Sequence, residues 1–508
     1  MGVIARQSIK GALANYLGVA IGFVTTFFVL TRMLTTEEVG LTRVIVDAAT
    51  LFACVAQLGT GSSLVRFFPH FKGRADGAFG LAMLASLTGF ALFMLAFLAF
   101  KGPITAAYVE QSPMVADYLY MLPLMTFFVL YLTVFETGAS VLMRITVPKM
   151  VREVGIRLMT LAAYLLYGYR VVDLDGFVWL FCGSYGAAML VGLFYLVKVA
   201  RENGTGLRRL FAIDWSFVRT QGMWKQMLGY TLTMTLAMLA GNVPLMSSIF
   251  IGAKAGLGLT GVYTIAFYIA NVVEVPYRSL GAISRPVVAA AVKDGDWAEV
   301  NRLGRQVSLH QLMVSSMIFL VIWINLDALF TLIPNGDDYR GGAVVVLLLG
   351  AAKMLNSSLS IGTDVLNYSR YYALSTVLAV VLTLSAIGLN SGLVESWGIG
   401  GAAAATLLSY AIYYLLLLAY IGWRLRVSLF SAGQLKTLAV IAVGFGMNYV
   451  WTLWLTPLFG SGVAALLADA LLKTAVIGGG TAAALVAWKV SPTVNAMADG
   501  MMKKLKIK

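Results

Sequence analysis

Apolar stretches long enough to cross a bilayer recur along the whole chain, and they constrain its fold more than any other feature. Of 508 residues, 60% are hydrophobic and only 12% are charged, with a mean hydropathy of +0.84. A soluble globular domain carries about a quarter charged residues, and a helical span needs roughly 20 apolar ones. The sequence therefore predicts an all-α polytopic membrane protein, in which the apolar stretches give about 14 transmembrane helices.

A weak internal repeat divides the predicted helices into two sets of six. At an offset of about 220 residues, of the kind seen in transporters, Gly40 matches Gly261 and Asp117 matches Asp338. Because six is an even number, both copies keep one membrane orientation, which predicts two lobes related by a pseudo-two-fold along the membrane normal, with a central cleft. The predicted domains are an N-lobe (helices 1–6), a basic cytoplasmic connector, a C-lobe (helices 7–12), two C-terminal helices (13 and 14) and a basic cytoplasmic tail, at residues 1–200, 201–226, 227–423, 424–490 and 491–508.

The net charge of +14 follows membrane topology and does not indicate nucleic-acid binding. If the amino terminus is cytoplasmic, about 29 of the 37 Lys and Arg residues fall in or beside cytoplasmic connections, which is the positive-inside pattern. We therefore expect both termini in the cytoplasm and no nucleic-acid partner. The lysines of the last six residues would contact anionic membrane lipids.

Nothing in the sequence indicates an enzyme or a cofactor. Cys54 and Cys182 both lie in apolar segments, and His70 and His310 are single, without a second ligand at metal-binding spacing. The chain has no Walker A loop for a nucleotide. The short outer loops offer no nucleophile with an acid or base beside it. We expect no metal, no cofactor and no catalytic residues.

The predicted span from Gly261 to Arg285 carries Asn271, Glu274 and Arg278 in an apolar background, with Pro276 between the last two. Polar groups at that depth are expensive and normally face a bundle interior or a water-filled cavity, so they are candidates for function. Glu274 and Arg278 are spaced to pair on one helix face. In a purely structural interpretation, they only neutralise each other and hold two helices together.

Lys353 lies about ten residues into another span, too deep to reach either interface easily. It either forms a buried ion pair with a carboxylate such as Glu136 or Asp47, or lines the cleft and binds an anionic substrate. The pairs Arg43–Asp47 and Asp469–Lys473 have helical spacing, and the second has a structural character. The complete set of substrate-binding candidates is Arg278, Lys353, Arg66, Asn271, Glu274, Glu136, Asp364 and Gln57.

Several motifs resemble a known superfamily. The end of helix 1, T-R-M-L-T-T-E-E-V-G, and the later Q-L-G-T-G-S-S-L-V-R-F are similar to the opening of bacterial polysaccharide and O-antigen flippases. These belong to the multidrug/oligosaccharidyl-lipid/polysaccharide exporter superfamily. E-V-P at Glu274–Pro276 and the following D-G-D-W-A-E-V-N-R-L resemble the eighth helix and its cytoplasmic exit in that superfamily.

The resemblance implies a flippase of the bacterial cytoplasmic membrane. Its partners would be an undecaprenyl-pyrophosphate-linked oligosaccharide, membrane lipids and a coupling ion, either a proton or sodium. It would move the glycan to the outer leaflet by alternating access, with a groove for the lipid tail in the stretch from Leu438. Lipid II flippases carry cavity arginines in helix 1 and before E-x-P, where this chain has Asn15 and Asn271. That difference argues against lipid II as the substrate.

Three other functions are compatible with parts of the sequence. A multidrug or cation antiporter of the same architecture would use a site centred on carboxylates such as Glu136 and Glu274. A membrane-embedded glycan polymerase or ligase would display a large outer loop, and the outer loops here are short. A scaffold that transports nothing would not need charges in the cleft.

Overall fold

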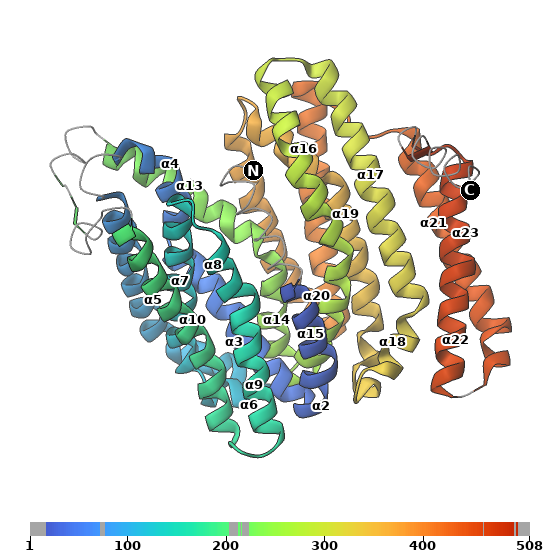
Figure 1. Ribbon diagram of the computed structural model, residues 1–508, viewed down its shortest axis with the longest axis horizontal. Coiled ribbons are helices and arrows are strands. Elements are labelled where there is room, and N and C mark those ends of the chain that lie inside the picture. The colour runs from blue at the N-terminus through green and yellow to red at the C-terminus, as the bar shows by residue number, and fades with distance from the viewer. Residues whose placement is uncertain are drawn as a thin grey trace. The chain divides into compact units, whose positions relative to one another are not determined.

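The computed structural model of the protein describes residues 17–71, 77–202, 212–213, 215, 223–460, 462–491 and 494–495. Within these residues the chain is helical and forms no strands (Figure 1). It divides into two compact units. Unit 1 comprises Met1–Thr264 and Asn390–Ala402, and unit 2 comprises Ile265–Leu389 and Ala403–Lys508. The domains predicted from the sequence repeat have other boundaries than these compact units. They stay a prediction.

The helices of unit 1 are η1 (Thr25–Leu30), α2 (Thr31–Met33), α3 (Thr36–Ala56), α4 (Thr60–Phe71), α5 (Gly77–Val109), α6 (Pro113–Asp117), α7 (Met121–Val141), α8 (Thr146–Met150), η2 (Val151–Gly155), α9 (Ile156–Gly168), α10 (Leu174–Glu202), α13 (Met223–Gly241) and α14 (Val243–Lys254). Two helices, α15 (Leu257–Asn271) and α20 (Ala373–Tyr420), contribute to both units. Unit 2 contains η3 (Val272–Glu274), α16 (Val275–Lys293), α17 (Trp297–Ile324), α18 (Leu326–Leu332), η4 (Gly336–Gly342), α19 (Ala343–Tyr368), η5 (Ile421–Leu425), α21 (Ala432–Trp454), η6 (Thr456–Phe459), α22 (Val463–Lys473), η7 (Thr474–Gly478) and α23 (Gly479–Ala487).

The helical membrane fold is confirmed. Among the described residues, ten helices are long and apolar enough to span a membrane, or eleven if the bent pair α13–α14 is one span. Predicted helix 1 is described from Leu17 to Met33, and predicted helix 5 is divided among α8, η2 and α9. Predicted helices 11 and 12 form α20, which is interrupted at Gly398 with φ +54° and ψ −130°. The count of about 14 and the symmetry of the lobes stay predictions.

Local sequence signals explain where several helices begin and bend. Pro244 predicts a kink in helix 7, and the structure confirms it, because α13 and α14 are bent by 62°. The letters T-T-E-E-V-G at residues 35–40 predict an outer turn between helices 1 and 2. This prediction is wrong, since α3 already begins at Thr36. Thr35 and Glu38 form a reciprocal capping box, which satisfies free backbone N–H groups and starts the helix earlier.

The starts of α3 and α15 approach each other backbone to backbone within unit 1. A Cβ built on Gly40 would collide with the carbonyl oxygen of Leu257, and a Cβ built on Gly261 would collide with that of Thr36. The contact is reciprocal, since each glycine faces the carbonyl four residues before the other. Gly40 and Gly261 are also the residues that the sequence repeat matches. Glycine is required at both positions, because no side chain fits between the helices.

In unit 2, α16, α17 and α19 pack against one another and run side by side in Figure 1. The last helices cover α17 through an apolar cluster in which Leu309 and Met313 contact Val440 of α21 and Leu485 of α23. The α16–α19 pair carries the charged residues described next.

Candidate functional site

The break between α15 and α16 places Glu274 inside the membrane-spanning part of unit 2. α15 ends at Asn271, the 3-10 turn η3 follows, and α16 starts with Pro276 in its first turn. Proline lacks a backbone N–H and clashes with the preceding turn, so it interrupts an α-helix but is tolerated in the first turn of a new one. Glu274 ends the 3-10 turn with only 9% of its surface exposed. A 3-10 segment in mid-helix often marks a functional hinge.

Lys353 of α19 is the partner of Glu274. Its Nζ lies 2.9 Å from Glu274 Oε2, and the two side chains are 6% and 12% exposed. The Nζ also lies 5.6 Å from the centre of the Phe267 ring. Asn356, one turn further along α19, donates from Nδ2 to Glu274 Oε1 at 2.6 Å. The Tyr414 hydroxyl donates to Asn356 Oδ1 at 2.7 Å and thereby holds the amide in place.

This arrangement neutralises a buried acid with a buried base and leaves both carboxylate oxygens hydrogen-bonded. Removing one partner of such a pair typically costs about 3–5 kcal/mol, because the other charge is then buried without compensation. A lysine that must leave its carboxylate therefore needs another anion within reach. The geometry suits a site that exchanges one anion for another.

A second ion pair joins the same two helices. Arg285 of α16 donates from Nε to Asp364 Oδ2 of α19 at 3.2 Å, and from a terminal nitrogen to the Tyr277 hydroxyl at 2.7 Å. The Arg285 side chain is 40% exposed and that of Asp364 17%. This pair is therefore more accessible than the pair formed by Lys353 and Glu274.

The two pairs form a regular series. Both join residues 79 positions apart, and residue numbers rise in the same direction along both helices, which are therefore parallel. At 1.5 Å per residue the pairs lie about 16 Å apart along the helices. The two pairs have opposite orientation. In the first pair the acid, Glu274, directly precedes α16, and in the second pair the acid, Asp364, lies on α19. Each helix thus offers one cation and one anion to the other.

Three predicted site residues lie in unit 1, each in surroundings of its own. Glu136 of α7 pairs with Arg152 of η2 at 2.6 Å, and Arg152 also donates to Thr133 at 2.9 Å. Gln57 follows the end of α3 and is 2% exposed. The exposed Arg66 stacks on Tyr230, with its Cζ 4.4 Å from the ring centre.

The structure thus corrects one proposed partner. Lys353 forms the predicted buried ion pair, but with Glu274 instead of Glu136 or Asp47. Asp47 pairs with Arg43, as the helical spacing predicts, and accepts a hydrogen bond from Ser248 at 2.6 Å. Among the described side chains of the eight candidates, the ion pair of Glu274 and Lys353 is the one that joins two of them.

The remaining two candidates lie close in sequence to Glu274. Asn271 ends α15 and is partly buried. Arg278 lies in α16, but its side chain is outside the described part of the structure. The prediction that it pairs with Glu274 therefore stays a prediction.

The residues predicted from the sequence do not include Arg285 or the two tyrosines that hydrogen-bond to the series, Tyr277 and Tyr414. One signal was available for Arg285. The interval from Glu274 to Arg285 equals the interval from Lys353 to Asp364, and the charges are opposite. No sequence signal distinguishes Tyr414 from the other tyrosines of α20, because its role depends on the position of Asn356.

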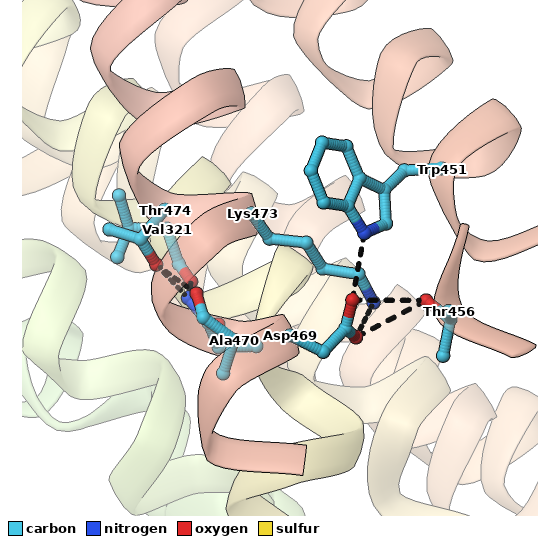
Figure 2. A network of polar contacts seen from close by, with 8 residues as sticks. Val321, Trp451, Thr456, Asp469, Ala470, Lys473 and Thr474 are labelled. Carbon is cyan, nitrogen blue, oxygen red and sulfur yellow. Dashed lines mark hydrogen bonds and ion pairs between the residues drawn. The ribbon is translucent and has the colours of Figure 1, made fainter. Parts of the chain in front are cut away.

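A separate polar network holds the last helices together. Asp469 accepts hydrogen bonds from the Trp451 indole at 2.8 Å and from Thr456 at 3.2 Å, and it pairs with Lys473 at 2.9 Å. Figure 2 shows these side chains converging on the carboxylate. Lys473 and Asp469 are only 8% and 5% exposed. Because every contact of the Asp469 carboxylate described above stays within α21, η6 and α22, we interpret this network as structural.

We expect Lys473→Met to lower the free energy of unfolding by about 3–5 kcal/mol, since it strands a buried carboxylate. Adding Asp469→Asn should recover much of this loss. The measurement is the midpoint of thermal unfolding in detergent, with Lys101→Met, at an exposed lysine of α5, as the control. Equal midpoints for the single and double variants would contradict the interpretation.

The family described as "Polysaccharide biosynthesis protein" matches residues 4–290, which is more than half of the chain. Among curated protein sequences, none matches.

Solved structures share the fold at low sequence identity. The lipid II flippase MurJ in an inward closed conformation is 12% identical, with a TM-score of 0.69, covering 95% of this chain and 100% of that chain. An inward-facing multidrug resistance MATE family transporter of the MOP superfamily is 15% identical, with a TM-score of 0.60, covering 84% and 98%. A MOP superfamily transporter from Pyrococcus furiosus is 15% identical, with a TM-score of 0.51, covering 83% and 95%. The chain has the fold of these transporters, and it belongs to the polysaccharide biosynthesis protein family.

Proposed function

We propose that this protein flips a lipid-linked oligosaccharide, carried on undecaprenyl pyrophosphate, across the bacterial cytoplasmic membrane by alternating access for surface polysaccharide synthesis. The buried pair of Lys353 and Glu274 is the observation that carries the proposal. The family description and the likeness in fold to a lipid II flippase support it. The positive-inside pattern supports cytoplasmic termini.

The substrate's pyrophosphate replaces Glu274 as the partner of Lys353. Charge-assisted hydrogen bonds contribute about 1.5–3 kcal/mol each, which is enough to select a diphosphate headgroup. Asn356 and Tyr414 keep Glu274 oriented, so that the carboxylate takes the cation back when the substrate leaves. Arg278 supplies a second cation for the pyrophosphate. Asn271, in the same unit, contributes a polar contact to the glycan.

Transport also needs a driving force. We propose that a proton or sodium ion binds the acids of the site, Glu274 or Asp364, in the step that returns the empty carrier. A ligand moves an equilibrium between two conformations only if it binds them with different strength. The coupling ion supplies that difference by weakening one acid–base pair in one of the two states.

Reconstitution tests this function directly. Purified protein in vesicles should move a fluorescent polyprenyl-diphosphate oligosaccharide between leaflets, and the lipid that co-purifies from native membranes should carry a diphosphate and a glycan by mass. Exchange of an organic cation against protons or sodium, without movement of the lipid, would overturn the proposal. It would favour the antiporter, which the likeness to MATE transporters keeps as the second candidate.

The exposed second pair gives a further prediction. We expect Arg285→Gln to lower transport about tenfold, since it removes a charged hydrogen bond at the accessible end of the series. Arg285→Lys should retain part of the activity, because it keeps the charge but not both contacts to Asp364 and Tyr277. Arg302→Gln breaks another exposed pair, with Glu299, and serves as the control in the same flipping assay. Equal rates for the Arg285 and Arg302 variants would remove Arg285 from the pathway.

A further inference from the structure

Two arginines and three aromatic residues meet where α19 and α20 end. Arg370 and Tyr371 lie in the turn after α19, Tyr420 is the last residue of α20, and Trp423 and Arg424 belong to the π-helical turn η5. All five residues belong to unit 2. They form a cluster that is separate from the pair of Lys353 and Glu274.

The aromatic rings fix the position of both guanidinium groups. The Cζ atoms of Arg370 and Arg424 lie 4.8 Å and 5.7 Å from the centre of the same Tyr371 ring. Tyr420 packs edge-on against Tyr371 at 5.8 Å and against Trp423 at 6.4 Å. Cation–π contacts of this kind favour a guanidinium over the ring face. Both guanidinium groups therefore lie against one aromatic ring, the Tyr371 platform.

No acid of the described chain neutralises these cations. Within the residues that the structure describes, neither Arg370 nor Arg424 forms an ion pair, whereas Arg43, Arg152 and Arg285 each pair with a carboxylate. Two like charges beside one ring repel each other. An anion from outside the chain that binds both guanidiniums removes this repulsion.

The surroundings favour a lipid headgroup as this anion. Trp423 and Tyr372 are 76% and 62% exposed, and exposed Trp and Tyr of membrane proteins gather at the headgroup level. The segment after α20, residues 421–436, contains Arg424, Arg426 and Lys436 and no acid, as expected on the cytoplasmic side. We propose that Arg370 and Arg424 form a binding site for the phosphate of an anionic lipid in the cytoplasmic leaflet. Arginine suits this role because its planar fork binds two phosphate oxygens at once.

A specific site predicts that lipid binding depends on these particular residues, whereas the net positive charge of the protein does not. Purified full-length protein, titrated with phosphatidylglycerol in a phosphatidylcholine background and followed by native mass spectrometry, should bind the anionic lipid. Replacing both arginines by Gln should weaken this binding about tenfold or more. Tyr371→Leu keeps both charges but removes the platform, and we expect it to weaken binding several-fold. Lys101→Gln removes an exposed cation of α5 and should leave binding unchanged.

Three outcomes would overturn the proposal. Unchanged binding in the double Gln variant would show that the anionic lipid sits elsewhere. Unchanged binding in Tyr371→Leu would reduce the cluster to unspecific surface charge. Displacement of the lipid by inorganic phosphate at equal concentration would identify a site for a free anion instead of a headgroup. The flipping assay is not involved, so the result is independent of the proposed function.

Discussion

Lys353→Glu should abolish glycan flipping, with a loss of at least about 100-fold. The substitution places two carboxylates where Lys353 and Glu274 now lie 2.9 Å apart. Each charge-assisted contact to a diphosphate contributes about 1.5–3 kcal/mol, and 1.4 kcal/mol is a factor of ten, so the loss of the contact together with the new repulsion predicts this decrease. The variant also removes the cation that we propose for the pyrophosphate. Initial flipping rates in vesicles measure the effect, normalised to the amount of folded protein.

The exchanged pair separates the structural role of Lys353 from its role in binding. Lys353→Glu combined with Glu274→Lys restores an acid–base pair, so thermal stability should recover. Flipping should stay low, because Asn356 now faces an ammonium group and the cation has moved to another helix. The same exchange at Arg43 and Asp47, a buried pair of unit 1, is the matched control for stability. Full recovery of flipping in the exchanged variant would mean that the pair only holds helices together.

Gly261→Ala should destabilise the protein by about 1–3 kcal/mol, the usual range for overpacking a close contact. The added Cβ points at the carbonyl oxygen of Thr36, and a backbone oxygen has no rotamer by which to move aside. α3 and α15 must then separate at their starts. Gly40→Ala should act alike, because its Cβ meets the carbonyl of Leu257. Thermal unfolding in detergent measures both effects.

Combining Gly40→Ala with Gly261→Ala tests whether the two glycines act through one contact. A single separation of α3 from α15 relieves both clashes, so Gly40→Ala with Gly261→Ala should cost hardly more than either change alone. Substitutions in contact are expected to be non-additive in this way. Gly183→Ala is the control, since its Cβ meets nothing within 4 Å and alanine favours the helix. Additive losses would show that the two glycines act independently.

Much of the fold could be predicted because each signal involved is local. Length and hydropathy predict helical spans, and Pro244 predicts the bend between α13 and α14. The capping box at Thr35 and Glu38 is also visible in the sequence, but the same letters T-T-E-E are typical of a turn. Helix caps and turns use the same residue types. A Thr followed three residues later by Glu indicates the start of a helix.

Partners across helices were harder to predict. The depth of Lys353 shows that it needs an anion, but several acids lie in other spans, and sequence alone does not rank them. Glu274 is the partner because the 3-10 turn before Pro276 directs it toward α19. Its hydrogen bond with Asn356 depends on the packing of helices remote in sequence. Such contacts appear only once the helices are placed.

The regular spacing of the two ion pairs has a mechanical consequence. A slip of α16 along α19 by one turn would separate Glu274 from Lys353 and Arg285 from Asp364 together. Because the polarity of the pairs is reversed, a slip over the whole interval between them would bring like charges together. Opening one pair to admit a substrate still leaves the other to hold the register. Shear between these helices is therefore disfavoured, and we infer that α16 and α19 tilt or rotate as one block during a transport cycle.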